Sequence, residues 1–258
     1  MKKLLALIFG LTLVFTLAAC GPRSTTARGY GLVHGHYVGV VEITVSRDGI
    51  VEAMTLDEYY LPYSWAKVSP DHAERDDVVV VVGTRRGGNP DLEADRTFTY
   101  YAKYIQIGDK LFTAEVLGTE GRQSINYKAT GIANIEDWVK ENDNAKWYVE
   151  QLDADAAFIA NADGTENTVL STLASDASSQ GWTKSETEYW RRADALGWPG
   201  NVEETINAII GLDLSGDFDL VRGEGNLWSI NDTVTGATWS DFPDYFNLAV
   251  RAYNNAVN

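Results

Sequence analysis

The stretch that decides the fold is His36–Ser46, which reads HYVGVVEITVS and is followed by Arg47-Asp48-Gly49 and a second apolar run, Ile50–Leu56. Apolar and small residues alternate along the first run, as they do in a strand that buries one face. An Asp-Gly pair between two such runs is a strong signal for a β-hairpin. We therefore expect two antiparallel strands, the first with one inward face: Tyr37, Gly39, Val41, Ile43 and Val45.

More strands are expected downstream of this hairpin. Five consecutive valines at Val78–Val82 predict a strand that is buried on both faces. The runs Thr97–Ile107 and Leu111–Leu117 flank Gly108-Asp109 and predict another hairpin.

The pattern becomes helical over about residues 134–212, which we interpret as a helical insertion. A capping box that opens at Ser185 predicts a helix ending at Gly197, and a second helix is expected over Asn201–Gly211. Strand character then returns at Phe218–Val221 and Leu227–Ile230. Strands before and after a helical middle predict the α+β class.

Composition excludes several kinds of function. The 258 residues include 37 acidic and 21 basic side chains, so the formal net charge is −16, which is unsuited to binding nucleic acid through its phosphates. One cysteine and three histidines leave no zinc pattern, and we expect no metal site. The catalytic motifs of serine hydrolases, P-loop enzymes and zinc proteases are also missing, so no catalytic residue is predicted.

The first twenty residues predict the location of the protein. Lys2 and Lys3 precede an apolar run, Leu4–Ala19, which is short for a membrane span and leads to Cys20. The segment LAAC at residues 17–20 resembles the lipobox of bacterial lipoproteins, in which the cysteine is diacylated after cleavage. An ordinary secretory signal that contains a cysteine is the alternative. Two acyl chains would give stable anchoring on the outer face of the cell membrane.

The expected domain organisation follows from this leader. Residues 1–19 are the predicted signal peptide, and residues 20–33 are a predicted linker because GPRSTTARGYG at 21–31 lacks apolar periodicity. Residues 34–258 are expected to form one domain.

The segment Asp232–Ser240 reads DTVTGATWS and lies just before a C-terminal helix that Ser240 or Asp241 is expected to cap. Gly236 allows a sharp turn, and Thr238 places a hydroxyl near the free N–H groups of the helix start. A phosphate would be stabilised there. The alternative interpretation is a glycine turn followed by a capped helix.

This segment closely resembles the flavinylation motif of the FMN-binding domain family, D-x-x-[ST]-G-A-[TS]. The resemblance implies FMN attached by a phosphoester to Thr238, transferred from FAD by a flavin transferase. It assigns four further motif residues and Ser240 to the cofactor site. The four motif residues are Asp232, Thr235, Gly236 and Ala237. Two more stretches fit the family, the opening Gly35–Gly39 and the C-terminal Leu248–Ala252.

The chain departs from the family in one loop. The family often has a Thr-Pro-Gly loop that touches the flavin ring after the second strand, and this chain has Tyr59–Tyr63 there, without the glycine. We place Leu61 and Pro62 at that position of the cofactor site.

The resemblance implies an anchored electron carrier. It would accept electrons from a membrane quinone-linked donor and pass them to extracellular acceptors, with FMN supplying the redox chemistry. The alternatives are a surface solute-binding lipoprotein without flavin and a flavin reductase with a substrate pocket over the ring.

Overall fold

The computed structural model describes residues 24–192 and 195–258. The predicted signal peptide and Cys20 lie outside the described residues. Among the described residues, no helix combines the length and apolarity that a membrane crossing requires.

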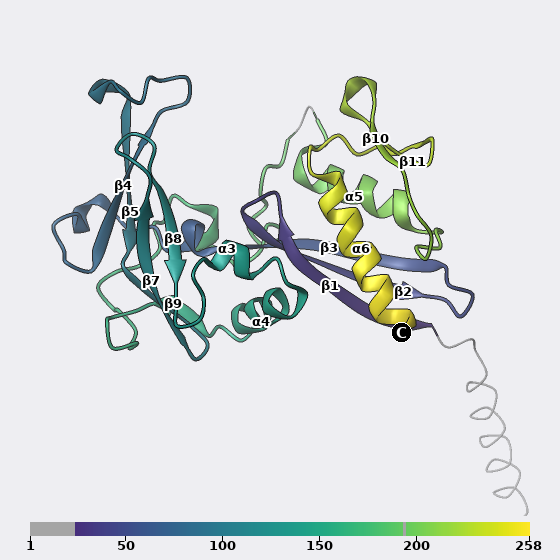
Figure 1. Ribbon diagram of the computed structural model, residues 1–258, viewed down its shortest axis with the longest axis horizontal. Helices are drawn as coiled ribbons and strands as arrows, with labels where there is room; N and C mark the ends of the chain where they lie inside the picture. Colours follow the sequence, from purple (N-terminus) through teal and green to yellow (C-terminus); the bar gives the residue numbers. More distant parts are fainter. Residues whose placement is uncertain (1–23, 193–194) are drawn as a thin grey trace, which may run out of the picture.

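A three-stranded antiparallel sheet forms the first part of the molecule (Figure 1). Its order is β1 (Thr25–Val33), β2 (Tyr37–Val45) and β3 (Val51–Tyr60). The β2–β3 hairpin turns at Asp48-Gly49, as predicted, and Val41, Ile43 and Val45 are buried.

The predicted linker is wrong over most of its length, because Thr25–Val33 pairs with β2 along nine consecutive positions. The sequence hides this strand because its glycines replace apolar residues. They let the C-terminal helix α6 (Phe242–Val257) lie directly on the sheet. A Cβ at Gly29 would come within 2.3 Å of the backbone oxygen of Leu248 in that helix.

The rest of this lobe comes from the end of the chain. Helix α5 (Gly197–Ile209) packs beside α6 and β3, and a small sheet follows with the order β10 (Leu220–Arg222), β11 (Trp228–Ile230) and β12 (Thr233–Val234). Buried side chains of α5, α6 and the three-stranded sheet β1–β3, called the central sheet below, form one continuous hydrophobic core.

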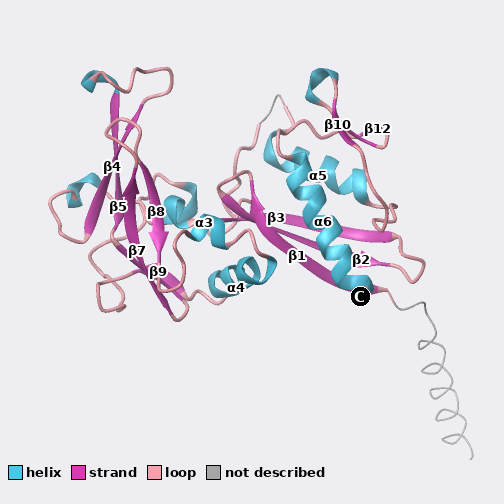
Figure 2. Cartoon of the chain, viewed as in Figure 1, coloured by secondary structure: helices cyan, strands magenta, loops and turns pink. Residues whose placement is uncertain are grey.

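Residues between β3 and α5 form a second lobe with its own core, and Figure 2 shows that this lobe consists mainly of strands. One sheet has the order β8-β7-β6-β9, and β4 pairs with β5. The elements are α2 (Pro62–Trp65), β4 (Val78–Thr84), β5 (Arg96–Ala102), β6 (Tyr104–Ile107), β7 (Lys110–Leu117), β8 (Ser124–Lys128), α3 (Ile135–Trp138), α4 (Asn142–Asp153) and β9 (Ala157–Ile159). Short 3-10 turns occur at Pro70–His72, Glu93–Asp95, Ala177–Ser179 and, in the first lobe, Glu224–Asn226.

The α+β class is therefore correct, and the hairpin across Gly108-Asp109 forms. The expected strand Thr97–Ile107 is divided, because β5 pairs with β4 while β6 pairs with β7 in another sheet. The expected helical insertion is wrong, because most of the inserted lobe precedes residue 134 and is made of strands. Val78–Val82 is a strand, but only Val81 among its valines is buried, because β4 lies in a two-stranded sheet. The helix expected from Ser185 to Gly197 is also wrong, since residues 184–190 form turns.

Candidate functional site

The motif Asp232–Thr238 runs from the end of β11 through β12 to the loop before α6. Asn231 and Asp232 have φ values of 47° and 66°, so both are left-handed and turn the chain sharply. Asp232 is exposed.

Three backbone and side-chain hydrogen bonds fix the middle of the motif against β11. The amide of Thr235 donates to the Trp228 carbonyl at 2.7 Å, and the Trp228 amide donates to the Ala237 carbonyl at 3.1 Å. The Ala237 amide donates to Thr235 Oγ1 at 3.2 Å. Thr235 and Ala237 are buried, so these two motif residues form the structural frame of the loop.

Gly236 lies against helix α5. A Cβ at this position would come within 1.9 Å of the carboxylate of Glu204. A side chain at this position would require the flexible Glu204 side chain to move away.

Asn201 of α5 holds the end of the motif, and sequence analysis assigned it no role there. Its Oδ1 accepts hydrogen bonds from the amides of Thr238 at 2.7 Å and Trp239 at 3.1 Å, and from Thr238 Oγ1 at 3.2 Å. Its Nδ2 donates to the Gly197 carbonyl at 2.7 Å, and the side chain is buried. Asn201 thus sets the position of the Thr238 hydroxyl.

Thr238 opens onto a pocket of about 420 Å³. Ser240 and Asp241 also line it, as do five aromatic side chains: Tyr189, Trp190, Trp198, Trp239 and Tyr245. Trp239 stacks on Tyr245 with ring centroids 4.1 Å apart. A pocket of this size with aromatic walls and a few polar groups suits a planar organic ligand.

One polar group of a pocket-lining residue is unpaired. Nε1 of Trp239 is buried and has no hydrogen-bond partner among the described residues, whereas buried polar groups normally have one.

Charges of both signs surround the pocket. Lys184, Arg222 and His34 line it together with Asp241, and the His34 ring pairs with the Asp241 carboxylate. Asp244, in the first turn of α6, accepts a hydrogen bond from the His34 amide at 3.1 Å. Burial raises the pKa of Asp244 above its ordinary value, although that hydrogen bond opposes the rise.

The start of α6 differs from the expected cap. Asp241 occupies the N-cap position, but its side chain caps no helix amide. Ser240 Oγ instead donates to the Asp241 carboxylate at 2.7 Å. Neither side chain therefore caps α6, although the Asp241 carbonyl accepts a hydrogen bond from the Asp244 amide at 2.9 Å.

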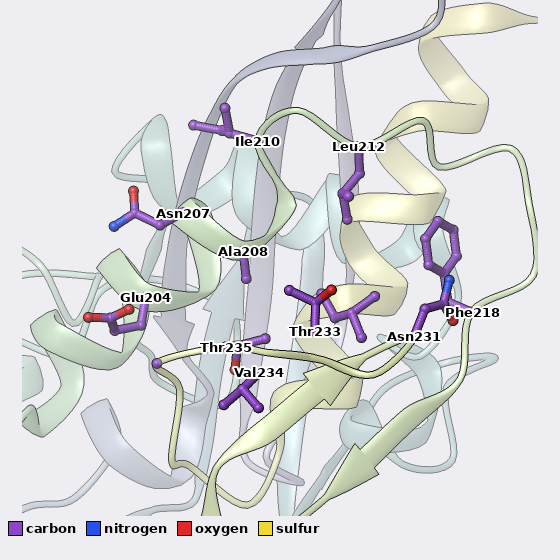
Figure 3. Close-up of a pocket in the computed structure, with 12 residues that line it drawn as sticks. Glu204, Asn207, Ala208, Ile210, Leu212, Phe218, Asn231, Thr233, Val234 and Thr235 are labelled. Carbon is purple, nitrogen blue, oxygen red and sulfur yellow. The ribbon is translucent and has the colours of Figure 1, made fainter.

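A second pocket of about 460 Å³ is also lined by residues of the motif (Figure 3). Glu204, Asn207 and Ala208 of α5 form one wall, and residues of the motif and β12 form another: Thr233, Val234 and Thr235. Thr238 is the motif residue that lines the aromatic pocket, whereas Thr233–Gly236 line this second one.

The structure does not bring Leu61 and Pro62 to the Thr238 pocket. Leu61 is fully buried in the core of the inserted lobe, and Pro62 begins α2 and is also buried. The ring-contacting loop of the family therefore has no counterpart there. Tyr189 and Trp190, from the segment that returns from the inserted lobe, line the pocket instead.

Comparisons with protein-family models, curated proteins and solved structures return no match for this chain. Within the residues that the structure describes, no group of three or more His, Cys, Asp or Glu side chains is arranged to hold a metal ion.

Proposed function

We propose that this chain is a membrane-anchored flavoprotein that carries FMN on Thr238 and relays electrons. The observation that carries the proposal is the position of Thr238: its hydroxyl is fixed by Asn201 on the wall of an aromatic pocket, within a segment that resembles a flavinylation motif.

The residues present fit a bound flavin. The stacked pair Trp239 and Tyr245 offers a flat aromatic surface on the pocket wall. Lys184 and Arg222 supply positive charge on the walls, where a phosphate and an electron-rich ring are stabilised. FMN would supply one- and two-electron chemistry, while the protein supplies position and charge.

Attachment would cost the loop little. The transferase would form a bond between Thr238 Oγ1 and the FMN phosphorus, break the diphosphate bond of FAD, and release AMP, while the hydroxyl proton is lost. Thr238 Oγ1 would then no longer donate to Asn201, but that bond is the longest of the three that Asn201 accepts. The two backbone amides would continue to hold the loop in place.

The proposed setting comes from the leader and from the resemblance. Diacylated Cys20 would anchor the chain on the outer face of the cell membrane. A flavin transferase would load it, a membrane quinone-linked donor would reduce it, and extracellular acceptors would oxidise it. A covalent link would prevent loss of the cofactor to the medium.

Loading in cells tests the proposal. The chain is co-expressed with a flavin transferase, denatured, and freed of small molecules by gel filtration. Flavin absorbance should remain with the protein in the wild type and in Thr233→Val and Ser240→Ala, and should be lost in Thr238→Val. Thr233 is an exposed threonine of the same motif, and Ser240 is the other pocket hydroxyl. A colourless wild-type chain, or a yellow Thr238→Val variant, would contradict the proposal.

A second candidate function rests on the inserted lobe. A pocket of about 600 Å³ there is lined by Tyr63, Tyr101, Lys67 and Glu136, and by His36 from the β1–β2 turn. This mixture of aromatic and polar side chains suits a small solute. A chain that stays colourless but whose melting temperature rises with a solute would favour this binding function.

A further inference from the structure

A buried ion pair lies behind the Thr238 pocket. Glu58 of β3 has no exposed surface, and its Oε2 is 2.7 Å from Nζ of Lys184, whose side chain is 4% exposed. The Lys184 amide also donates to the Glu58 carbonyl at 3.0 Å. The lysine is therefore fixed to the central sheet by both its backbone and its side chain.

The carboxylate of Glu58 is fully engaged. Its Oε1 accepts hydrogen bonds from Trp198 Nε1 at 2.5 Å and from the Tyr245 hydroxyl at 3.0 Å. These donors come from α5 and α6, so three separate parts of the chain meet at one carboxylate. Such a network holds Glu58, and through it Lys184, in one position.

The ammonium of Lys184 contacts one carboxylate and two aromatic rings. Glu58 is the one oxygen acceptor that the described residues offer it, and the ring centroids of Tyr37 and Tyr189 lie 3.6 and 4.5 Å from Nζ. Lys184, Tyr189, Trp198 and Tyr245 all line the Thr238 pocket. Lys184 is therefore part of the pocket wall, with its ammonium held between the Glu58 carboxylate and the two tyrosine rings.

Stability alone is a weak explanation for this pair. Burying two charges costs free energy that their attraction often only offsets, and well-packed apolar residues usually do as well. Burial also lowers the pKa of Lys184, although the attraction of Glu58 opposes this effect.

We propose that Lys184 raises the reduction potential of the flavin in this pocket, and that Glu58 is the positioning residue that holds it there. This inference rests on the proposed function. Adding two electrons and one proton to the ring leaves it one unit more negative. Lys184 lines the pocket and Glu58 does not, so the ammonium is the nearer charge of the pair and stabilises the reduced form more than the oxidised one. The electrons come from the proposed quinone-linked donor, or from dithionite in the test.

The test compares loaded proteins by their midpoint potentials. The double variant Glu58→Gln/Lys184→Gln removes the lysine while keeping the buried site neutral and hydrogen-bonded. We expect its preference for reduced over oxidised flavin to fall at least tenfold, which is about 30 mV for a two-electron couple. Lys140→Gln removes an exposed charge from the inserted lobe and should leave the potential unchanged. A loaded double variant with the wild-type potential would overturn the inference.

A second measurement needs no variant. Amine acetylation followed by peptide mass spectrometry compares Lys184 in the unloaded and loaded wild-type chain, with the exposed lysines as internal references. Loading should slow the labelling of Lys184 at least tenfold and leave Lys140 unchanged. Equal labelling of Lys184 in both forms would overturn the inference even if the double variant does not fold. A wild-type chain that takes up no flavin would overturn the proposed function and this inference together.

Discussion

At the scale of single residues, Asn201 positions Thr238 in the candidate site. One amide oxygen accepts from two backbone amides and one hydroxyl, and all of these donors belong to two consecutive residues, Thr238 and Trp239. The sequence singled out Asn201 only as the expected start of a helix, which in fact begins at Gly197. Its contact with the motif was not predicted, because its partners lie 37 and 38 positions away. The motif could be identified from the sequence, but the side chain that holds it in place could not.

Asn201→Ala should therefore destabilise the unloaded protein by about 1–3 kcal/mol, since partly buried donors lose their acceptor. Flavin loading should fall as well, because the Thr238 hydroxyl loses its fixed position. Urea unfolding and the flavin content of co-expressed protein measure the two effects. Asn207→Ala, an exposed asparagine on the same helix, is the control and should change neither. Equal behaviour of the two variants would show that Asn201 has no such role.

Asp232 should matter for loading and not for folding. It is exposed, and its left-handed backbone is one that asparagine also adopts readily, so Asp232→Asn should change stability by no more than about 0.5 kcal/mol. In the FMN-binding domain family, which this segment resembles, the acid belongs to the stretch that the transferase recognises, so under the proposed function loading should drop strongly. Asp217→Asn, which makes the same charge change at another exposed position, should load normally. Normal loading of Asp232→Asn, or a large loss of its melting temperature, would count against this role.

At the scale of elements, the sequence correctly predicted the turns that a local residue pattern determines by itself. The two hairpins at Asp48-Gly49 and Gly108-Asp109 have strong turn signals, and both form. The helix expected from Ser185 fails because tertiary partners take its polar groups. Ser185 Oγ donates to the Asp57 carboxylate, and Lys184 pairs with Glu58. Ser185 of the predicted capping box therefore contacts β3 and does not cap a helix.

Strand β1 forms where a linker was predicted, and this error suggests a test. Its glycines looked like a linker, yet Gly29 lies under α6. Gly29→Ala should destabilise the protein by about 1–3 kcal/mol, because the added methyl group overlaps the Leu248 carbonyl. Gly216→Ala, where no atom lies within 4 Å, should change stability by less than about 1 kcal/mol. Thermal or urea unfolding decides, and equal stability of the two variants would contradict the packing of α6 on β1.

At the scale of the whole molecule, an inserted lobe interrupts the lobe that carries the motif. The chain leaves β3 at Tyr60 and returns beside it, where the Tyr60 amide donates to the Trp182 carbonyl at 3.0 Å. The returning segment supplies Lys184 and Tyr189 to the pocket of Thr238. The pocket thus gathers residues from His34 to Tyr245, and a sequence pattern cannot reveal contacts over such separations.

Net charge also acts at this scale, because the full sequence carries −16 and removal of the predicted signal peptide with Lys2 and Lys3 would leave −18. Anionic lipid headgroups repel so acidic a surface, so a lipid-anchored form should project away from the membrane. That orientation would suit exchange of electrons with acceptors outside the cell.

The measurement that tests the central claim most directly is peptide mass spectrometry of the chain co-expressed with a flavin transferase. The account predicts that the peptide containing Asp232–Ser240 gains the mass of one FMN less water, with fragment ions that place it on Thr238. An unmodified peptide in protein produced with an active transferase, or a flavin found on another residue, would contradict it.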